Sequence, residues 1–223
     1  MSTSHRFIIE VVDQKTGCVI DEVPFEVDRL ELLCAQLMIN PAAFDPGLHY
    51  ELDEDDIMRI KTALKVDITR GQSQSSIYLR GRRPVDDLPY KVHTNRELIL
   101  MLARSKPLAA YVEDHPRVTV HEVIPESAFE PYVVSGRFVK REKLYPGSDG
   151  VAGVRNGAHR SIRRVLYAQR EEAWRIDAYL LLHETAVYSG WNEGFERMEG
   201  TLLGYEQWQN DAYIEMTRAR RQK

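Results

Sequence analysis

The sequence has few cysteines, no long hydrophobic run and no secretory signal pattern at its start. Two cysteines, Cys18 and Cys34, are too few for a disulfide framework in 223 residues, and Cys34 lies in an apolar run that predicts a buried thiol. The longest uncharged apolar stretch near the middle of the chain, residues 98–103, is far shorter than a membrane span. The apolar run near the start, residues 7–12, is too short and too soon interrupted by charge for a signal peptide. These absences predict a cytoplasmic protein that folds without disulfides and has no membrane partner.

The sequence also lacks a strong surplus of either charge, because 30 Lys and Arg stand against 34 Asp and Glu, a net charge of −4. A mildly acidic chain is poorly suited as a whole to coat nucleic acid or an anionic membrane, although a local basic patch can still do so. The apolar fraction of 43% and the charged fraction of 29% are typical of globular proteins. The length suits one large domain or two small ones.

Hydrophobic periodicity predicts strands and helices in alternation over the first two thirds of the chain. The expected strands span residues 7–12, 18–27, 76–80, 87–92, 108–112, 118–124 and 137–144. The expected helices span residues 30–39, 54–64, 94–104 and 127–134. Two segments, about 7–39 and 76–104, share an order of strand, turn, strand and capped helix, and Asp21–Val27 resembles Asp86–Val92. The similarity predicts a duplicated ββα unit, although any hairpin that leads into a capped helix has this pattern.

The last third of the sequence predicts helices. Four glycines in residues 146–157 predict a mobile loop that separates residues 1–145 from a mainly helical part, residues 158–223. Residues 164–168 fit a last strand or the start of the helices. The spacing of Trp174, Ala178, Leu181 and Thr185 predicts the buried stripe of a helix over residues 171–188. Further apolar residues broaden this stripe: Ile176, Tyr179, Leu180 and Val187. Similar stripes follow in two further helices. The fold class is therefore α+β: a sheet-containing part with one or two ββα units, then a helical part packed on it.

One short segment combines the candidate catalytic and pocket residues. His183 and Glu184 stand together on a predicted helix as in a zinc protease, but Val187 occupies the position of the second histidine, so no metal or cofactor is predicted. The candidate catalytic residues are His183, Glu184 and Glu196, and the candidate pocket residues are Trp191, Asn192 and Tyr205. Gly194 within a helix predicts a close approach of another backbone or a ligand.

A run of arginines forms the candidate partner-binding surface. Its members are Arg155, Arg160, Arg163, Arg164 and Arg170, with Arg175 and His159 beside them. Guanidinium groups match carboxylates and phosphates alike, so the run suits an acidic protein or a nucleic acid. A solvated start of a helix is the alternative without a binding role.

These patterns predict a non-enzymatic cytoplasmic interaction protein of the adaptor, regulator or inhibitor type, with its contact surface at residues 155–175. An enzyme with a small-molecule site at the C-terminal helices is the first alternative. A nucleic-acid-binding protein that uses the arginine run is the second. The sequence does not predict the oligomeric state.

Overall fold

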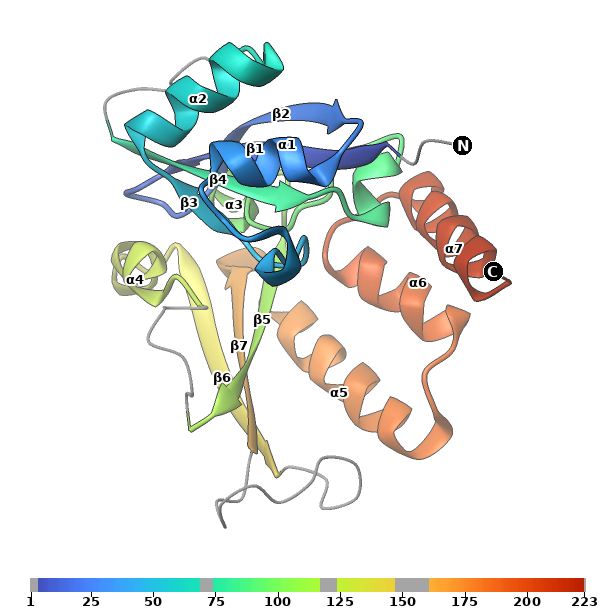
Figure 1. Cartoon of the computed structure of the whole chain (residues 1–223). Coiled ribbons are helices and arrows are strands. Elements are labelled where there is room, and N and C mark those ends of the chain that lie inside the picture. Colours follow the sequence, from blue (N-terminus) through green and yellow to red (C-terminus); the bar gives the residue numbers. More distant parts are fainter. Residues whose placement is uncertain (1–3, 69–73, 117–123, 147–160, 223) are drawn as a thin grey trace. The chain divides into compact units, whose positions relative to one another are not determined.

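The computed structural model describes residues 4–68, 74–116, 124–146 and 161–222 (Figure 1). The chain is α+β, as predicted: two antiparallel sheets are interleaved with helices in the first two thirds, and three helices follow. It divides into two compact units, unit 1 (residues 1–96) and unit 2 (residues 97–223). Within the described ranges, no helix combines the length and the hydrophobicity that crossing a bilayer requires.

Unit 1 is built on a four-stranded sheet in the order β2-β1-β4-β3. Its strands are β1 (His5–Asp13), β2 (Val19–Val27), β3 (Tyr50–Leu52) and β4 (Ser75–Gly81). Its helices are α1 (Leu30–Gln36), η1 (Pro41–Ala43), α2 (Glu54–Leu64) and η2 (Pro84–Asp87). The helix α2 has the bounds that its apolar spacing predicts, and Asp53 caps it by accepting a hydrogen bond from the backbone N–H of Asp56.

The two faces of this sheet differ in chemistry because neighbouring side chains on a strand point to opposite faces. Phe7 and Ile9 of β1 belong to the hydrophobic core, together with Leu33 of α1, Ile60 of α2 and Leu79 of β4. Ile8 and Glu10 point the other way. Their cross-strand partners are Pro24 and Glu22 of β2 and Arg80 and Tyr78 of β4. The face opposite the core therefore carries charged side chains.

Pro24 lies in the middle of β2, which is an edge strand. The carbonyl of Arg6 accepts a hydrogen bond from the N–H of Arg82, so the even-numbered residues of β1 direct their backbone groups towards β4. Ile8 is one of them, and Pro24 is its partner on β2. The ring nitrogen of Pro24 therefore faces the outer edge of the sheet, where proline costs the ladder no hydrogen bond.

The predicted strand at residues 87–92 is wrong. Residues 84–87 form the short helix η2, and residues 88–96 contain no strand. Pro84 begins η2, where the missing N–H is harmless, and the backbone N–H of Arg83 binds the Asp86 carboxylate at 2.6 Å. The segment 76–104 thus holds one strand where the duplicated ββα pattern has two.

Unit 2 is built on a three-stranded sheet in the order β5-β7-β6. Its strands are β5 (Leu108–His115), β6 (Phe138–Pro146) and β7 (Ser161–Gln169). Its helices are α3 (Glu97–Leu102), α4 (Glu126–Val134), η3 (Arg170–Glu172), α5 (Trp174–Ser189), α6 (Glu193–Leu202) and α7 (Gln207–Arg221). Residues 164–168 therefore belong to a strand. Most of the strand predicted at residues 118–124 lies outside the described residues.

The glycine-rich segment is not the boundary between the two compact units. Residues 147–157 lie outside the described residues, but the strands that flank them, β6 and β7, pair along their whole length. The boundary falls instead between Arg96 and Glu97, before α3.

The helix α5 packs on the sheet of unit 2 with only part of its predicted apolar stripe. Its buried residues are Ile176, Tyr179, Leu180 and Leu182, which share a core with Leu166 of β7. Trp174 and Leu181, on the predicted stripe, are 57% and 64% exposed. Apolar residues occur on both sides of α5, so their spacing alone could not select the buried side.

Candidate functional site

A buried arginine organises the charged face of the unit 1 sheet. Arg80 of β4 is 1% exposed. Its Nε lies 2.5 Å from Oε1 of Glu10, and its two terminal nitrogens lie 2.7 and 3.0 Å from the carboxylate oxygens of Asp86. Two parallel hydrogen bonds to one carboxylate fix the plane of a guanidinium group. Arg80 therefore links β1 and β4 to η2 with a defined geometry.

The two carboxylates bound to Arg80 are held in their ionised form. Burial raises the pKa of Glu10, but hydrogen bonds from His49 and Arg80 outweigh it, and the pKa is lowered. Burial likewise opposes ionisation of Asp86, while hydrogen bonds from Arg80 and the Arg83 backbone lower its pKa. Both groups are thus anions at neutral pH, and Arg80 neutralises part of their charge.

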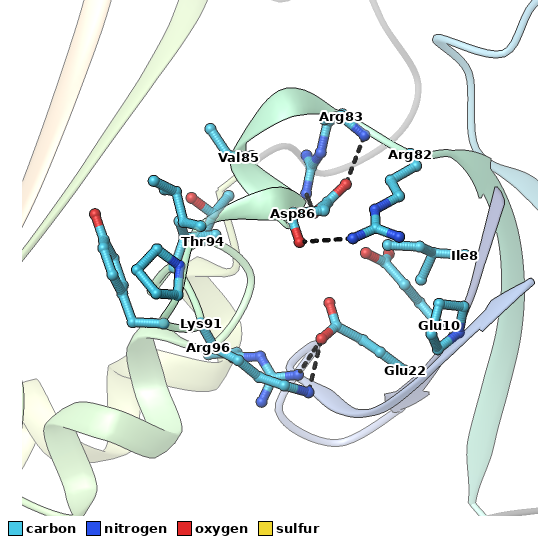
Figure 2. A pocket seen from close by; sticks show the side chains of 15 residues that line it. Ile8, Glu10, Glu22, Arg82, Arg83, Val85, Asp86, Lys91, Thr94 and Arg96 are labelled. Atoms are coloured by element: carbon cyan, nitrogen blue, oxygen red, sulfur yellow. Dashed lines mark hydrogen bonds and ion pairs between the residues drawn. The ribbon is translucent and has the colours of Figure 1, made fainter. Parts of the chain in front are cut away.

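The chain that follows β4 returns across this face and forms the rim of a pocket. Glu22 of β2 anchors the far end of the rim: Nζ of Lys91 lies 2.9 Å from its carboxylate and Nη2 of Arg96 lies 3.1 Å from it. At the near end, Arg82 contacts the backbone of Asp86, and Arg83 contacts its carboxylate. Figure 2 shows these two groups of contacts on opposite sides of a central hollow.

The hollow is a pocket of about 300 Å³ with a mixed lining. Its polar side chains are Glu10, Glu22, Arg82, Arg83, Asp86, Lys91, Thr94 and Arg96. Its other lining residues are Ile8, Pro24, Val85, Leu88, Pro89, Tyr90 and Val92. Charged groups beside an apolar wall are typical of sites that orient a ligand by a few polar contacts.

Three arginines of the pocket have hydrogen-bond donors that the described chain leaves unused. Nε of Arg82, Nε of Arg83 and Nη2 of Arg96 are buried and have no hydrogen-bond acceptor among the described residues. Nη2 of Arg96 is close to Glu22, but the contact is an ion pair without hydrogen-bond direction. A buried donor without an acceptor costs about 1–3 kcal/mol. An acceptor brought by a ligand would remove that cost at three places in one pocket.

The described arginines of the sequence-predicted surface do not share one face of unit 2. Arg155 and Arg160 lie outside the described residues. Arg163 and Arg164 are neighbours on β7 and therefore point to opposite faces of the sheet. Arg170 donates to the carbonyl of Gly136 at 2.6 Å.

Arg163 lies in a network of carboxylates. It makes 2.7 Å contacts with Glu113, Glu126 and Glu142, and its side chain is 13% exposed. Arg164, on the other face, lies over the rings of Tyr145 and Tyr179, each 5.5 Å from its guanidinium carbon. Arg163 is thus engaged within unit 2, whereas Nε and Nη1 of Arg164 are buried and have no hydrogen-bond acceptor among the described residues.

The Arg163 network predicts a specific acid sensitivity. The hydrogen bond from Arg163, with one from Lys140, lowers the pKa of Glu126 from 4.5 to about 2, against the effect of burial. A carboxyl with a lowered folded-state pKa stabilises the fold above its unfolded-state pKa, and this contribution disappears as the pH falls towards the folded-state value. We expect Glu126→Gln to flatten the dependence of unit 2 stability on pH between about 4.5 and 2, measured by thermal unfolding at a series of pH values. Glu130→Gln, an exposed position on the same helix, is the control, and an equal flattening there would contradict the assignment.

The structure brings two of the C-terminal candidates together. Nε2 of His183 lies 2.9 Å from Oε1 of Glu199, and the rings of His183 and Trp191 stack with centroids 5.0 Å apart. The hydroxyl of Tyr179 donates to the same oxygen of Glu199 at 2.9 Å. Burial raises the pKa of Glu199, but the hydrogen bonds from His183 and Tyr179 outweigh it and the pKa is lowered.

The other C-terminal candidates have separate partners. Glu184 pairs with Lys143, and Glu196 accepts a hydrogen bond from Nε1 of Trp191. The side chain of Asn192 caps α6 by accepting from two backbone N–H groups, and Tyr205 has Nζ of Lys106 5.7 Å from its ring centre.

The prediction that another backbone lies close to Gly194 is wrong among the described residues. A Cβ there would meet only Oδ1 of Asn192, at 3.0 Å. The tight helix contact lies six residues later, where a Cβ on Gly200 would lie 1.9 Å from Oδ1 of Asn210 in α7. Among the described residues, no three His, Cys, Asp or Glu side chains are placed to hold a metal ion.

Comparisons of the chain with protein-family models, with curated proteins and with solved structures found no match. The function is therefore inferred from the residues of the chain.

Sequence reasoning missed the unit 1 pocket, although a signal was present: Glu10 interrupts the apolar run at residues 7–12, and Arg80 ends the apolar run of β4. A charge inside a strand predicts a buried ion pair or a site.

Proposed function

We propose that this chain is a non-enzymatic cytoplasmic interaction protein whose unit 1 pocket captures an anionic group of a protein partner. The observation that carries the proposal is the set of buried, unused N–H groups on Arg82, Arg83 and Arg96 around one pocket. Guanidinium groups bind carboxylates and phosphates through directed N–H contacts. The proposed contact surface is the pocket rim at residues 82–96, in place of the predicted residues 155–175.

The charges in the pocket favour binding over proton transfer. A general acid or base works best when its pKa is near the working pH. Glu10 and Asp86 both have lowered pKa values and are hydrogen-bonded to Arg80. Glu22 is held by Lys91 and Arg96. These carboxylates are suited to hold the cations in position rather than to accept a proton from a substrate.

The test compares two peptide libraries that differ at one position. One library has a fixed central glutamate, the other a fixed central glutamine, and both have random flanks and a fluorescent label. We expect the full-length chain to bind the glutamate library more tightly by fluorescence anisotropy. The double variant Arg82→Gln/Arg83→Gln should lose at least about tenfold in affinity, since even one charge-assisted hydrogen bond contributes roughly 1.5–3 kcal/mol and about 1.4 kcal/mol corresponds to tenfold.

The control is Arg218→Gln/Arg220→Gln, which removes the same charge from two exposed positions on α7. We expect this variant to bind like the unmodified chain. An equal loss in both double variants would mean that the peptides bind through general charge attraction. Equal binding of the glutamate and glutamine libraries, together with no binding of any phosphorylated library, would overturn the proposal.

A further inference from the structure

We infer that the group captured in the unit 1 pocket is a phosphate monoester on a side chain of the partner protein. The inference rests on the proposed function and narrows it to one chemical class of ligand. Three features of the pocket support it: the number of separate donors, the balance of charge and the size of the hollow.

The unused donors match a group with three acceptor oxygens. They belong to three different guanidinium groups, those of Arg82, Arg83 and Arg96. Arg82 and Arg83 lie on the Asp86 side of the hollow, and Arg96 lies on the Glu22 side with Lys91 (Figure 2). A phosphate monoester presents three terminal oxygens in different directions, whereas a carboxylate presents two in one plane. Donors on both sides of the hollow therefore fit the phosphate better.

The charge around the pocket also matches a dianion. The cations are Arg80, which pairs with two lining carboxylates, and Arg82, Arg83, Lys91 and Arg96 in the lining; the lining carboxylates are Glu10, Glu22 and Asp86. Asp87, which contacts Arg82, has a cation of its own in Arg6 at 3.3 Å. The cations therefore exceed the carboxylates by two. A phosphate monoester carries about −1.5 to −2 at pH 7, so it would neutralise this excess, and a carboxylate would neutralise half of it.

Two of the cations, Lys91 and Arg83, are exposed enough to turn towards the ligand. The side chain of Lys91 is 65% exposed and that of Arg83 is 38% exposed. Exposed ion pairs such as Lys91–Glu22 are weak, so a stronger anion can compete for these cations. Arg80, by contrast, is fixed by Glu10 and Asp86 and keeps its charge beside them.

The size of the pocket fits a modified side chain. A volume of about 300 Å³ is at the lower end of the range for small-molecule sites. A phosphorylated side chain can enter such a hollow with its stem against the apolar lining of Val85, Leu88 and Pro89. The backbone of the partner would then lie across the rim.

The experiment extends the library comparison to phosphorylated peptides. Three further libraries carry a central phosphoserine, phosphothreonine or phosphotyrosine, and the full-length chain is titrated into each beside the glutamate library. We expect at least one phosphorylated library to bind about tenfold or more tightly than the glutamate library, because a phosphate adds 1–3 charge-assisted hydrogen bonds. Arg96→Gln should remove most of this preference, and Arg218→Gln should leave it unchanged.

The pH dependence gives an independent measurement. The second pKa of a phosphate monoester is about 6, so the preferred library should bind several-fold more weakly at pH 5.5 than at pH 7.5. The glutamate library should change less over this range, because a glutamate side chain is ionised throughout it.

The outcomes separate the inference from the proposed function. Equal affinity for the phosphorylated and glutamate libraries would overturn the inference and leave the proposed function standing. Binding to neither would overturn both. Inorganic phosphate that competes at the same concentration as the phosphopeptides would identify the free ion as the ligand and would also overturn the inference.

Discussion

Replacing Arg80 by methionine is expected to lower the free energy of unfolding of unit 1 by about 3–5 kcal/mol, the usual effect of removing one partner from a buried ion pair. The change would leave Glu10 and Asp86, which are 3% and 7% exposed at their side chains, without their shared guanidinium. Methionine fills much of the arginine stem, so the loss should come from charge rather than from volume. Amide hydrogen exchange in β1 and β4 measures the effect on unit 1 specifically.

The pH dependence tests the cause of this destabilisation. Glu10 and Asp86 have lowered pKa values in the folded chain, so their ionised forms stabilise the fold above the usual carboxyl pKa and this contribution declines as the pH falls. The difference between Arg80→Met and the unmodified chain should therefore be largest at neutral pH and shrink in acid. Arg218→Met, at an exposed ion pair with Glu193, is the control and should unfold like the unmodified chain. A deficit that stays constant in acid would point to lost packing.

Gly204→Ala is expected to destabilise unit 2 by about 2–4 kcal/mol, because it combines a strained backbone with a steric clash. Gly204 follows α6 and has a φ of +93°, and a Cβ there would lie 2.4 Å from Cδ of Pro107. The proline ring cannot rotate away as a long side chain could. The loss of stability should be measurable by chemical denaturation followed through tryptophan fluorescence. All three tryptophans, Trp174, Trp191 and Trp208, lie in unit 2, so the signal reports on that unit.

Gly190→Ala separates the two contributions. Gly190 has a φ of +76°, and no described atom lies within 4 Å of its Cβ position. Alanine there should cost only the positive-φ backbone conformation, about 1–3 kcal/mol. If the two alanine variants were equally destabilised, the close approach of Pro107 to Gly204 would not contribute.

Local patterns predicted the fold class and many of the elements. The helix α2 has the expected bounds, and α4 and β6 begin within one residue of the expected positions. These elements depend on neighbouring residues, such as the acidic first turn of α2 or the alternation in β6. The face of α5 could not be predicted in the same way, because it is selected by the sheet against which the helix packs.

The charges within β1 and β4 were a signal for a site, but which residues meet in it could not be predicted, because that depends on strand register. Glu10 and Arg80 are 70 residues apart and meet only when β1 and β4 pair. Glu22 joins them through the register of β2 on β1. The arginine run failed as a guide to a single surface for the opposite reason: Arg163 and Arg164 are neighbours in sequence, but the alternation of β7 places them on different faces.

The position of Pro24 has a consequence for the behaviour of the chain at high concentration. An edge strand with a continuous row of unpaired N–H groups is a template on which strands of other molecules can add, as in cross-β fibrils. The outward-facing ring of Pro24 interrupts that row in the middle of the nine-residue strand β2. Unit 1 can therefore end its sheet in a long strand without offering a continuous template for aggregation.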